Sequence, residues 1–254
     1  QELKTLWDEV RNKKPLITEK LVIDGPFSAN IGEDIFTPCD EDEVILCLNY
    51  NGKFGLNNMN LYFQNANNNS EPFTWAEWTF KIGDKVIFVD TKRSALLYNN
   101  LKGKIVNISK NESSITFTLD VDTVLNEQQC LGEDFEFIKA NHKSTRIRLI
   151  VLADDENITE ENRLKTIIPF QIAYAVSIHK AQGLEFNSVK IIIPPVNAER
   201  ITHSIFYTAI TRAKEQLKIY WSAETMKTII SSFTDLSVKQ QSLDIIKKKL
   251  LSEE

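Results

Sequence analysis

The chain has 254 residues, 42% of them hydrophobic, and a formal net charge of -5. This length and apolar content can bury a proper core, and they predict one large domain with an insertion, or two domains. The net charge disfavours binding of nucleic acid over the whole surface but is compatible with a local basic track. The three scattered cysteines have no C-x-x-C pair and no nearby histidine, so we expect reduced thiols in a cytoplasmic protein. No apolar run approaches about 18 residues and no signal peptide is visible, so a membrane role has no support.

The first part of the chain predicts a connecting segment, a buried strand and a helix. Residues 1–40 combine a short amphipathic pattern with an acidic stretch that contains proline, and we expect them to serve as a connection. Residues 43–48 are apolar and predict a buried strand. Gly55 precedes a helical pattern over residues 56–64, and the asparagine run of residues 65–70 predicts a surface loop.

A different pattern follows from about residue 80 to residue 138. Short β-branched and aromatic runs recur at a spacing of roughly ten residues, with turn residues between them, which predicts a small all-β barrel. Four side chains here could contact a single nucleic-acid strand by stacking and positive charge. Solvated loops with one packed tyrosine explain the same residues equally well. The residues concerned are Lys92, Arg93, Tyr98 and Lys102.

The phosphate-binding loop G-x-x-x-x-G-K-S/T does not occur anywhere in the sequence. Residues 149–156 form an apolar run that ends in acids and look like a Walker B element. We interpret them as an ordinary strand and turn, because the polar residues continue and no phosphate loop precedes them.

Residues 173–178 predict a strand, a polar loop follows, and residues 189–193 predict a second strand. The loop gathers a hydroxyl, an imidazole, an ammonium, an amide and a carboxylate around Gly183, which can adopt positive φ or permit close backbone approach. The residues that carry these groups are Ser177, His179, Lys180, Gln182 and Glu185. Such a loop suits the recognition of phosphates and sugar hydroxyls.

Residues 205–213 predict a packed helix, because apolar residues recur there at helical spacing. That spacing leaves four polar residues on the other faces: Thr208, Thr211, Arg212 and Lys214. An apolar strand over residues 217–221 follows, and then residues 223–254 alternate apolar and charged residues at a helical period.

These segments resemble the motifs of superfamily 1 helicases. Residues 175–186 resemble motif V of the RecD-like and UvrD-like C-terminal motor domain, T-x-H-K-x-Q-G-x-E-F, with Ser177 in place of the commoner threonine. The helix that contains Arg212 resembles motif VI, Y-x-A-x-T-R-A. The strand and helix around Gly55 are similar to motif IV, but Asn51 stands where RecD-like members commonly carry an arginine. The β-rich region resembles the SH3-like barrel inserted in RecD-like helicases.

The resemblance implies a role for each matching residue. Arg212 matches the arginine finger that reaches the γ-phosphate of ATP across the interface between two RecA-like domains. Glu185 matches the acid that accepts a hydrogen bond from the nucleotide sugar, and Gly183 lets the backbone approach, so ATP with Mg²⁺ is the implied cofactor. The implied contacts to single-stranded DNA are Ser177, His179, Lys180, Gln182, Thr208, Tyr98 and Lys102. Taken singly, Glu185 as a turn cap and Arg212 in a surface ion pair are the alternatives.

The implied fold is α/β: a second RecA-like motor domain of the P-loop NTPase type, without the Walker A half. We expect strand-ending loops to bring motifs IV, V and VI together at one sheet edge. The expected boundaries are a connecting segment at 1–40, the motor domain at 41–78 and 141–222, the SH3-like barrel at 79–140, and C-terminal helices at 223–254.

The implied function is that of an ATP-dependent DNA helicase, whose ATP site is completed by an N-terminal RecA-like domain of the same protein. Because Gln1 is not a natural start, we expect the chain to be part of a longer protein and to be inactive alone. Single-stranded DNA is the implied partner, a nuclease or repair protein is a further candidate, and the bacterial cytoplasm is the implied location.

Two other functions are compatible with the residues. One is a non-catalytic module that binds nucleic acid or protein and retains a helicase-like fold; a Walker A motif encoded upstream of Gln1 would favour the motor instead. The other is a stand-alone hydrolase that uses His179 or His203, but neither histidine has a paired nucleophile at a suitable spacing.

Overall fold

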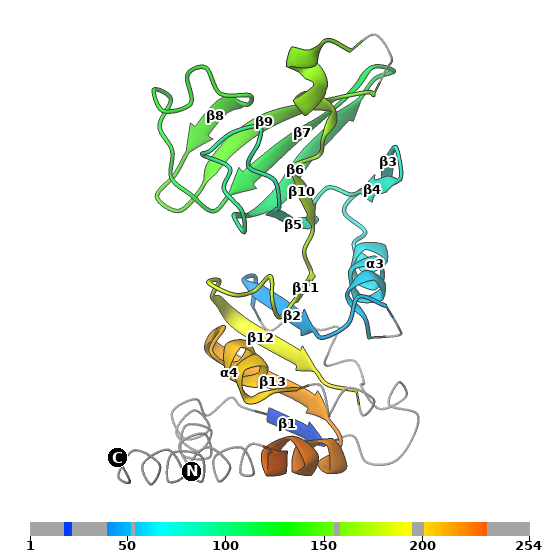
Figure 1. The fold of residues 1–254 in the computed structure, drawn as a ribbon. Helices are drawn as coiled ribbons and strands as arrows, with labels where there is room; N and C mark the ends of the chain where they lie inside the picture. Colours follow the sequence, from blue (N-terminus) through cyan, green and yellow to red (C-terminus); the bar gives the residue numbers. More distant parts are fainter. Residues whose placement is uncertain (1–17, 22–39, 52–53, 155–157, 195–200, 233–254) are drawn as a thin grey trace, which may run out of the picture. The chain divides into compact units, whose positions relative to one another are not determined.

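The computed structural model describes residues 18–21, 40–51, 54–154, 158–194 and 201–232 (Figure 1). The chain divides into two compact units. Unit 1 comprises Gln1–Asn58 and Val176–Glu254, and unit 2 comprises Met59–Ala175. Within the described residues, no helix is both long and apolar enough to cross a membrane.

Unit 1 is built on a five-stranded sheet with the strand order β1-β13-β12-β2-β11. The central strand β12 pairs in parallel with both β2 and β13, and β13 pairs in parallel with β1. The strands are β1 (Thr18–Leu21), β2 (Glu43–Cys47), β11 (Ala175–Ser177), β12 (Phe186–Ile192) and β13 (Ala213–Trp221). Every residue of β2 is buried, as the continuous apolar run predicts for a strand covered on both faces. The predicted strand at 43–48 is thus confirmed.

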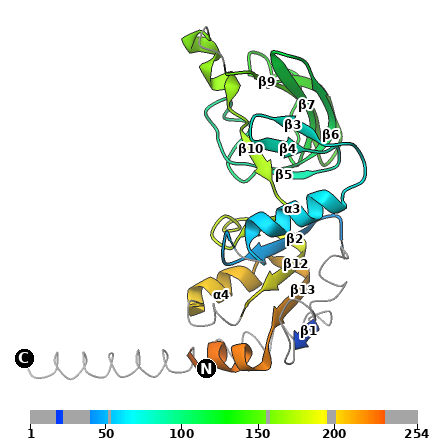
Figure 2. The ribbon, with the colours of Figure 1, turned by 90° about the vertical axis from the view of Figure 1, so that its right-hand side faces the viewer.

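Two helical segments belong to unit 1, and a third, α3, begins there and continues into unit 2. Helix α3 spans Leu56–Ala66 and confirms the helix predicted at 56–64. Helix α4 spans His203–Ile210 and lies against β13, as both ribbon views show (Figures 1 and 2). Residues 223–232 form a further helix, and the rest of the expected C-terminal helices, 233–254, lies outside the described residues.

The N-terminal residues do more than connect. Strand β1 pairs with β13 from Thr18 to Leu21 and is one edge of the parallel sheet. The remainder of the expected connecting segment, up to Cys39, lies outside the described residues.

Unit 2 contains a six-stranded antiparallel sheet with the order β10-β5-β6-β7-β9-β8, which is curved in Figure 2. Its strands are β5 (Lys85–Phe88), β6 (Lys102–Lys110), β7 (Ser114–Val121), β8 (Glu136–Ala140), β9 (Thr145–Leu152) and β10 (Phe170–Ile172). A small hairpin of β3 (Phe73–Trp75) and β4 (Trp78–Phe80) precedes it, and the 3₁₀ helix η2 (Glu160–Thr166) follows β9. The all-β character predicted for this region is confirmed over these strands.

The core of unit 2 lies on one face of this sheet. Buried and half-buried residues alternate along the whole of β7, so every second side chain enters the core. Four aromatic rings meet there in edge-to-face contacts, with centroids 5.0 to 5.8 Å apart. They are Phe80, Phe88, Phe117 and Phe170.

The division between the units differs from the boundaries we expected. Strand β9 pairs with β7 along its full length, so residues 145–152 belong to the antiparallel sheet and not to the parallel sheet. Buried and exposed side chains alternate along β9, as in a strand with one face on a core. Ile147, Leu149 and Val151 are buried in the core of unit 2, whereas Ile150 is 48% exposed. The run that resembles a Walker B element is therefore an antiparallel strand of unit 2.

A buried carboxylate ties the start of β5 to neighbouring segments of unit 2. Asp84 is fully buried and accepts hydrogen bonds from Gln64 Nε2 (2.7 Å), Asn67 Nδ2 (2.9 Å), the Tyr174 hydroxyl (2.9 Å) and the Lys81 amide (2.8 Å). Burial, and then the neighbouring Asp84, raise the pKa of Tyr174. The network fixes residue 174, one residue before β11.

Both described cysteines are buried free thiols. Burial raises the pKa of Cys47 to about 12. The expectation of reduced thiols is thus met by Cys47 and Cys130. Cys39 lies outside the described residues.

Candidate functional site

Helix α4 places Arg212 at a fixed point of unit 1. Thr202 caps the helix by accepting a hydrogen bond from the Ile205 amide, and Phe206 stacks on Trp221 of β13 with ring centroids 5.7 Å apart. The helix ends at Ile210, and Arg212 lies in the short turn that leads into β13. Phe206, Ala209 and Ile210 are buried, as the helical spacing predicts. The prediction of a helix that extends to residue 213 and contains Arg212 is wrong, because the chain leaves the helix after Ile210 and enters β13 at Ala213.

The guanidinium of Arg212 is held by three different acceptors. Nε donates to the carbonyl oxygen of Thr208 (2.9 Å), Nη1 to the carbonyl oxygen of Leu184 (2.9 Å) and Nη2 to the hydroxyl of Thr211 (3.0 Å). Two of these acceptors belong to the end of α4, where a cation is favoured by the helix dipole. The third belongs to the loop before β12, so Arg212 joins the motif VI helix to the motif V loop.

The motif V loop consists of successive turns. The Ser177 hydroxyl accepts from the Lys180 amide (3.2 Å), and the Ser177 carbonyl accepts from the Ala181 amide (3.0 Å). The Leu184 amide then donates to the Ala181 carbonyl (3.0 Å) around Gly183, whose φ is +83°. This is the geometry of a type II turn, which needs positive φ at its third residue. Gly183 is thus required by backbone conformation, since an added Cβ would meet nothing within 4 Å.

The side chains of this loop differ in exposure. His179 and Gln182 are exposed and Lys180 is half-buried, so these three can reach a ligand. Ser177 is only 5% exposed, and its hydroxyl serves the turn just described. Of the residues in this loop that are predicted to contact single-stranded DNA, Ser177 is therefore the one whose side chain stabilises the loop itself.

Glu185 lies at the end of the loop, beside the turn that contains Arg212. Its carboxylate is 3.6 Å from Lys214 Nζ, and both side chains are at least half exposed. The next amide, that of Phe186, donates to the Arg212 carbonyl (2.9 Å). Exposed ion pairs contribute little to stability, so this carboxylate is available to a ligand at little cost. Thr208, by contrast, contributes its main-chain carbonyl to Arg212 and has a half-buried side chain.

The three motifs do not share one sheet edge. Glu185 and Arg212 directly precede β12 and β13, so they lie at the amino ends of these parallel strands. The motif IV segment that includes Asn51 follows β2, which is parallel to β12, and so lies at the carboxyl end. The motif V loop begins near that end, because the Ile178 amide donates to the Cys47 carbonyl (3.3 Å). The expectation that all three motifs lie at one sheet edge is therefore wrong. It assumed that every motif follows a strand, whereas Glu185 and Arg212 precede theirs.

Motif IV is organised by a close backbone approach. A Cβ on Gly55 would lie 2.4 Å from the carbonyl oxygen of Asn51, and so only glycine fits there. The approach lets the Leu56 amide donate to the Asn49 carbonyl (2.9 Å). Asn51 accepts a hydrogen bond from Asn57 Nδ2 (3.3 Å), so its side chain makes a local contact.

Sequence reasoning missed a buried ion pair in the centre of the sheet. Lys190 of β12 is 0% exposed, and its Nζ lies 2.7 Å from a carboxylate oxygen of Glu43. The other oxygen of this carboxylate accepts from the Ser188 hydroxyl (2.7 Å). Charges are rarely buried unless they are paired. A lysine inside an otherwise apolar strand was the available signal, and the pair joins β2 to β12.

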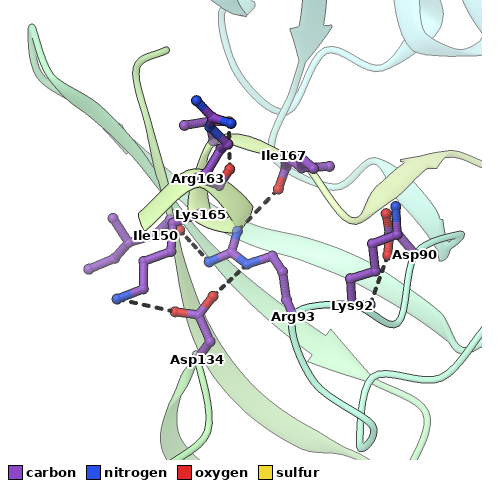
Figure 3. A network of polar contacts seen from close by, with 9 residues as sticks. Asp90, Lys92, Arg93, Asp134, Ile150, Arg163, Lys165 and Ile167 are labelled. Carbon is purple, nitrogen blue, oxygen red and sulfur yellow. Dashed lines mark hydrogen bonds and ion pairs between the residues drawn. The ribbon is translucent and has the colours of Figure 1, made fainter. Parts of the chain in front are cut away.

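In unit 2, Arg93 is a structural residue and not a candidate for strand contact. Its side chain is 2% exposed, and Figure 3 shows it between three segments of the chain. It donates to Asp134 (2.7 Å), to the Ile150 carbonyl (2.7 Å) and to the Ile167 carbonyl (3.2 Å). Of the two interpretations left open for Arg93, the structure therefore favours a structural role over contact with a nucleic-acid strand, because the side chain is buried and its three acceptors are intramolecular.

The other predicted residues of unit 2 remain accessible. Tyr98 is 48% exposed, Lys92 is exposed, and Lys102 is 3.9 Å from Asp122. They lie in a different unit from Arg212 and the motif V loop. The structure thus brings together the predicted residues of motifs V and VI in unit 1. Tyr98 and Lys102 lie in unit 2.

A row of charged residues crosses the sheet of unit 2, and the sequence alone did not reveal it. In the register of the strands, Lys85 is opposite Lys104, Lys104 opposite Asp120, Asp120 opposite Arg146, and Arg146 opposite Lys139. Asp120 and Arg146 form a bidentate pair (2.7 and 2.8 Å). The row lies on the face opposite the aromatic core, because the neighbouring β7 residues are the ones buried in it. We call these five residues the basic row.

Comparisons with known proteins match the part of the chain that contains motifs V and VI. Residues 172–220 match the model of the UvrD-like helicase C-terminal domain. The chain is 26% identical over 196 residues to RecD, a subunit of the RecBCD enzyme, from Buchnera aphidicola subsp. Schizaphis graminum (strain Sg). It is 24% identical over 181 residues to RecD from Buchnera aphidicola subsp. Acyrthosiphon pisum (strain APS). These matches cover 76% and 69% of this chain but only 27% and 24% of the relatives.

Among solved structures, the Pif1 helicase from Candida albicans is a match. It is 14% identical in sequence, its TM-score is 0.42, and the match covers 80% of this chain and 51% of that chain.

Proposed function

The chain carries a C-terminal domain of the superfamily 1 helicases, and we propose that this domain is RecA-like and supplies Arg212 as the arginine finger of a shared ATP site. The supporting observation is the placement of Arg212. Its guanidinium is held by three acceptors at the amino end of β13, beside the exposed Glu185. A fixed guanidinium that is always charged, next to an accessible carboxylate, suits a nucleotide whose phosphates are bound mainly by another domain.

We further propose that an N-terminal motor domain of the same protein provides the phosphate loop and the Mg²⁺ ligands. The sequence contains no G-x-x-x-x-G-K-S/T pattern, so this chain lacks a cradle for the β- and γ-phosphates. Mg²⁺ would neutralise charge on the phosphates when bound. The part of this chain is to present Arg212 to the γ-phosphate and Glu185 to the sugar, with Gly183 shaping the loop between them.

The motif V loop is the proposed link to a single DNA strand. His179, Lys180 and Gln182 offer an imidazole, an ammonium and an amide at the start of the loop, and Leu184 at its end contacts Arg212. Closure of the site around ATP would therefore move a segment that also touches the strand. In unit 2, which we propose to be the SH3-like insertion, Tyr98, Lys102 and the basic row would follow the strand by stacking and charge.

The RecD relatives are subunits of the RecBCD enzyme, and we propose a multisubunit DNA-processing enzyme as the setting for this protein. Co-purification of the full-length protein with its native partners tests this proposal. A full-length protein that purifies alone would contradict it.

The test of the proposed function is ATP turnover by the full-length protein, with and without single-stranded DNA, beside this chain alone. We expect turnover stimulated by the strand in the full-length protein and none in the chain. Arg212→Ala should lower turnover by about 1000-fold, the effect of losing an arginine finger, while strand binding persists. Arg163→Ala is the control, since Arg163 is an exposed arginine whose ion pair is with Glu160, three residues away.

The alternative function, a binding module without catalysis, draws support from Asn51, which bonds to Asn57 where an arginine is common. Strand binding without turnover in the full-length protein would favour this module. Turnover that survives Arg212→Ala would also contradict the arginine-finger proposal.

A further inference from the structure

We propose that Thr211 is a positioning residue for Arg212, and that the Leu184 carbonyl is the second fixed point of the guanidinium. This inference rests on the proposed function, because it concerns how Arg212 is presented to a phosphate. It adds a residue with no assigned role to the site and states what its hydroxyl does.

The hydroxyl of Thr211 is shared between the helix and the arginine. Its oxygen lies 2.9 Å from the Tyr207 carbonyl oxygen and 3.1 Å from the Thr208 carbonyl oxygen, and 3.0 Å from Arg212 Nη2. A hydroxyl has one proton and two acceptor lone pairs. It therefore donates to the end of α4 and accepts from Arg212, and so ties the guanidinium to the frame of the helix.

The remaining contacts define the plane of the guanidinium. Nε is held by the Thr208 carbonyl and Nη1 by the Leu184 carbonyl, each at 2.9 Å. A planar group fixed at three of its nitrogens cannot rotate without breaking one of these bonds. Thr211 and Leu184 thus hold the two Nη atoms from opposite sides, one from the helix and one from the loop.

A count of donors shows why this arrangement suits a phosphate. A guanidinium has five N–H groups, and the three hydrogen bonds use one on Nε and one on each Nη atom. One N–H remains on each Nη atom, so both Nη atoms keep a donor for a phosphate oxygen. Arg212 can therefore bind its ligand without leaving its three anchors. A pre-set fork needs no reorganisation when charge develops on the phosphoryl group.

The competing explanation is that Thr211 only satisfies the last carbonyls of α4. Such a cap would stabilise the helix and would have no effect that depends on Arg212. The two explanations differ in what the loss of the hydroxyl does to turnover and in whether that loss needs Arg212.

The experiment compares Thr211→Val, which has a similar shape and no hydroxyl, with Thr211→Ser, which keeps the hydroxyl. In the full-length protein, Thr211→Val should lower kcat for ATP about tenfold, the scale of a misplaced catalytic group, with less than about a twofold change in KM. Thr211→Ser should restore at least about half of the wild-type kcat. Combined with Arg212→Ala, Thr211→Val should cause no further loss, since its effect passes through the guanidinium.

Folding is checked by thermal unfolding, and Thr211→Ala serves as a second variant without the hydroxyl, because Thr211 is only half-buried. Unchanged kcat in both hydroxyl-free variants would overturn the inference, as would an equal loss in the Arg212→Ala background. If Arg212→Ala itself leaves turnover unchanged, the proposed function fails instead. The outcomes thus separate the two proposals.

Discussion

Arg212 donates from Nη1 to the carbonyl oxygen of Leu184 at a distance of 2.9 Å, which joins the turn after α4 to the loop before β12. The contact is reinforced in the backbone, where the Phe186 amide donates to the Arg212 carbonyl (2.9 Å). The residue proposed to meet the phosphate is therefore bonded to the loop proposed to meet the strand. Any movement of one has to be accommodated by the other.

The first prediction concerns the effect of Arg212 on that loop. Arg212→Ala removes the side-chain anchor of Leu184, so the amide of Leu184 should exchange its hydrogen faster in this chain. A hydrogen bond from a charged donor contributes about 1.5 to 3 kcal/mol, so we expect about a tenfold or greater acceleration. Hydrogen exchange followed by mass spectrometry or NMR measures it. Arg163→Ala is the control and should leave the loop unchanged; equal exchange rates in all three proteins would show that the contact does not hold the loop.

The second prediction concerns the positive φ of Gly183. A side chain at φ +83° is strained, so Gly183→Ala should lower the free energy of unfolding by about 1 to 2 kcal/mol. Gly183→Asn should cost less, because asparagine tolerates this region better. Denaturant titration checks both values.

Unit 2 provides a matched control for this glycine. Gly132 has φ +82°, and a Cβ there would also meet nothing within 4 Å. Gly132→Ala should therefore have a similar cost in stability and no effect on ATP turnover of the full-length protein, whereas Gly183→Ala should lower turnover. A loss of turnover in both variants would mean that stability, and not the type II turn, explains the effect.

The third prediction concerns the buried pair of Lys190 and Glu43. Lys190→Met leaves the Glu43 carboxylate buried without its cation, and should lower the free energy of unfolding by about 3 to 5 kcal/mol. Replacing both residues, with Glu43→Leu added, should recover most of this loss, because no unpaired charge remains. Arg148→Met is the exposed control: its pair with Glu136 is 44% and 60% exposed and should contribute about 1 kcal/mol or less. A double variant no more stable than Lys190→Met would refute the charge explanation.

The sequence predicted the elements whose signal is local and missed those that depend on distant partners. The apolar run of β2 and the glycine before α3 are local, and both were interpreted correctly. The run at residues 149–152 reads as a continuous apolar strand, and only its pairing with β7 shows that Ile150 faces outward. The role of Arg93 depends on carbonyl groups at residues 150 and 167, which no side-chain pattern reports.

Less of the candidate site could be predicted from the sequence. Motifs V and VI are each a short continuous segment, so their polar groups could be identified, but the roles given to those groups come from the resemblance to helicases and stay predictions. The position of Ser177 inside the fold and the pairing of Lys190 with Glu43 follow from strand register, which brings together residues about 145 apart in the chain.

The fourth prediction concerns the basic row of unit 2. Asp120 is paired with Arg146, so the row presents an excess of lysine charge on the exposed side of the sheet. Lys104→Glu and Lys139→Glu should each weaken binding of a single-stranded oligonucleotide by this chain. The slope of log affinity against log salt should fall by about 0.7 for each phosphate that the variant no longer neutralises.

Lys227→Glu is the control for this experiment, because Lys227 is an exposed lysine on the helix at residues 223–232 and the substitution changes the charge by the same amount. Fluorescence anisotropy at several salt concentrations measures all three variants. An equal effect of Lys227→Glu would mean that net charge alone attracts the strand, and an unchanged affinity in the row variants would remove the row from the interface. Lys104 is opposite Lys85 on one neighbouring strand and opposite Asp120 on the other, so Lys104→Glu exchanges one like-charge pair for another and should change the stability of unit 2 little. A Lys104→Glu variant that binds less while unfolding at the wild-type temperature would therefore show that the lost affinity comes from the missing positive charge and not from a loss of folded protein.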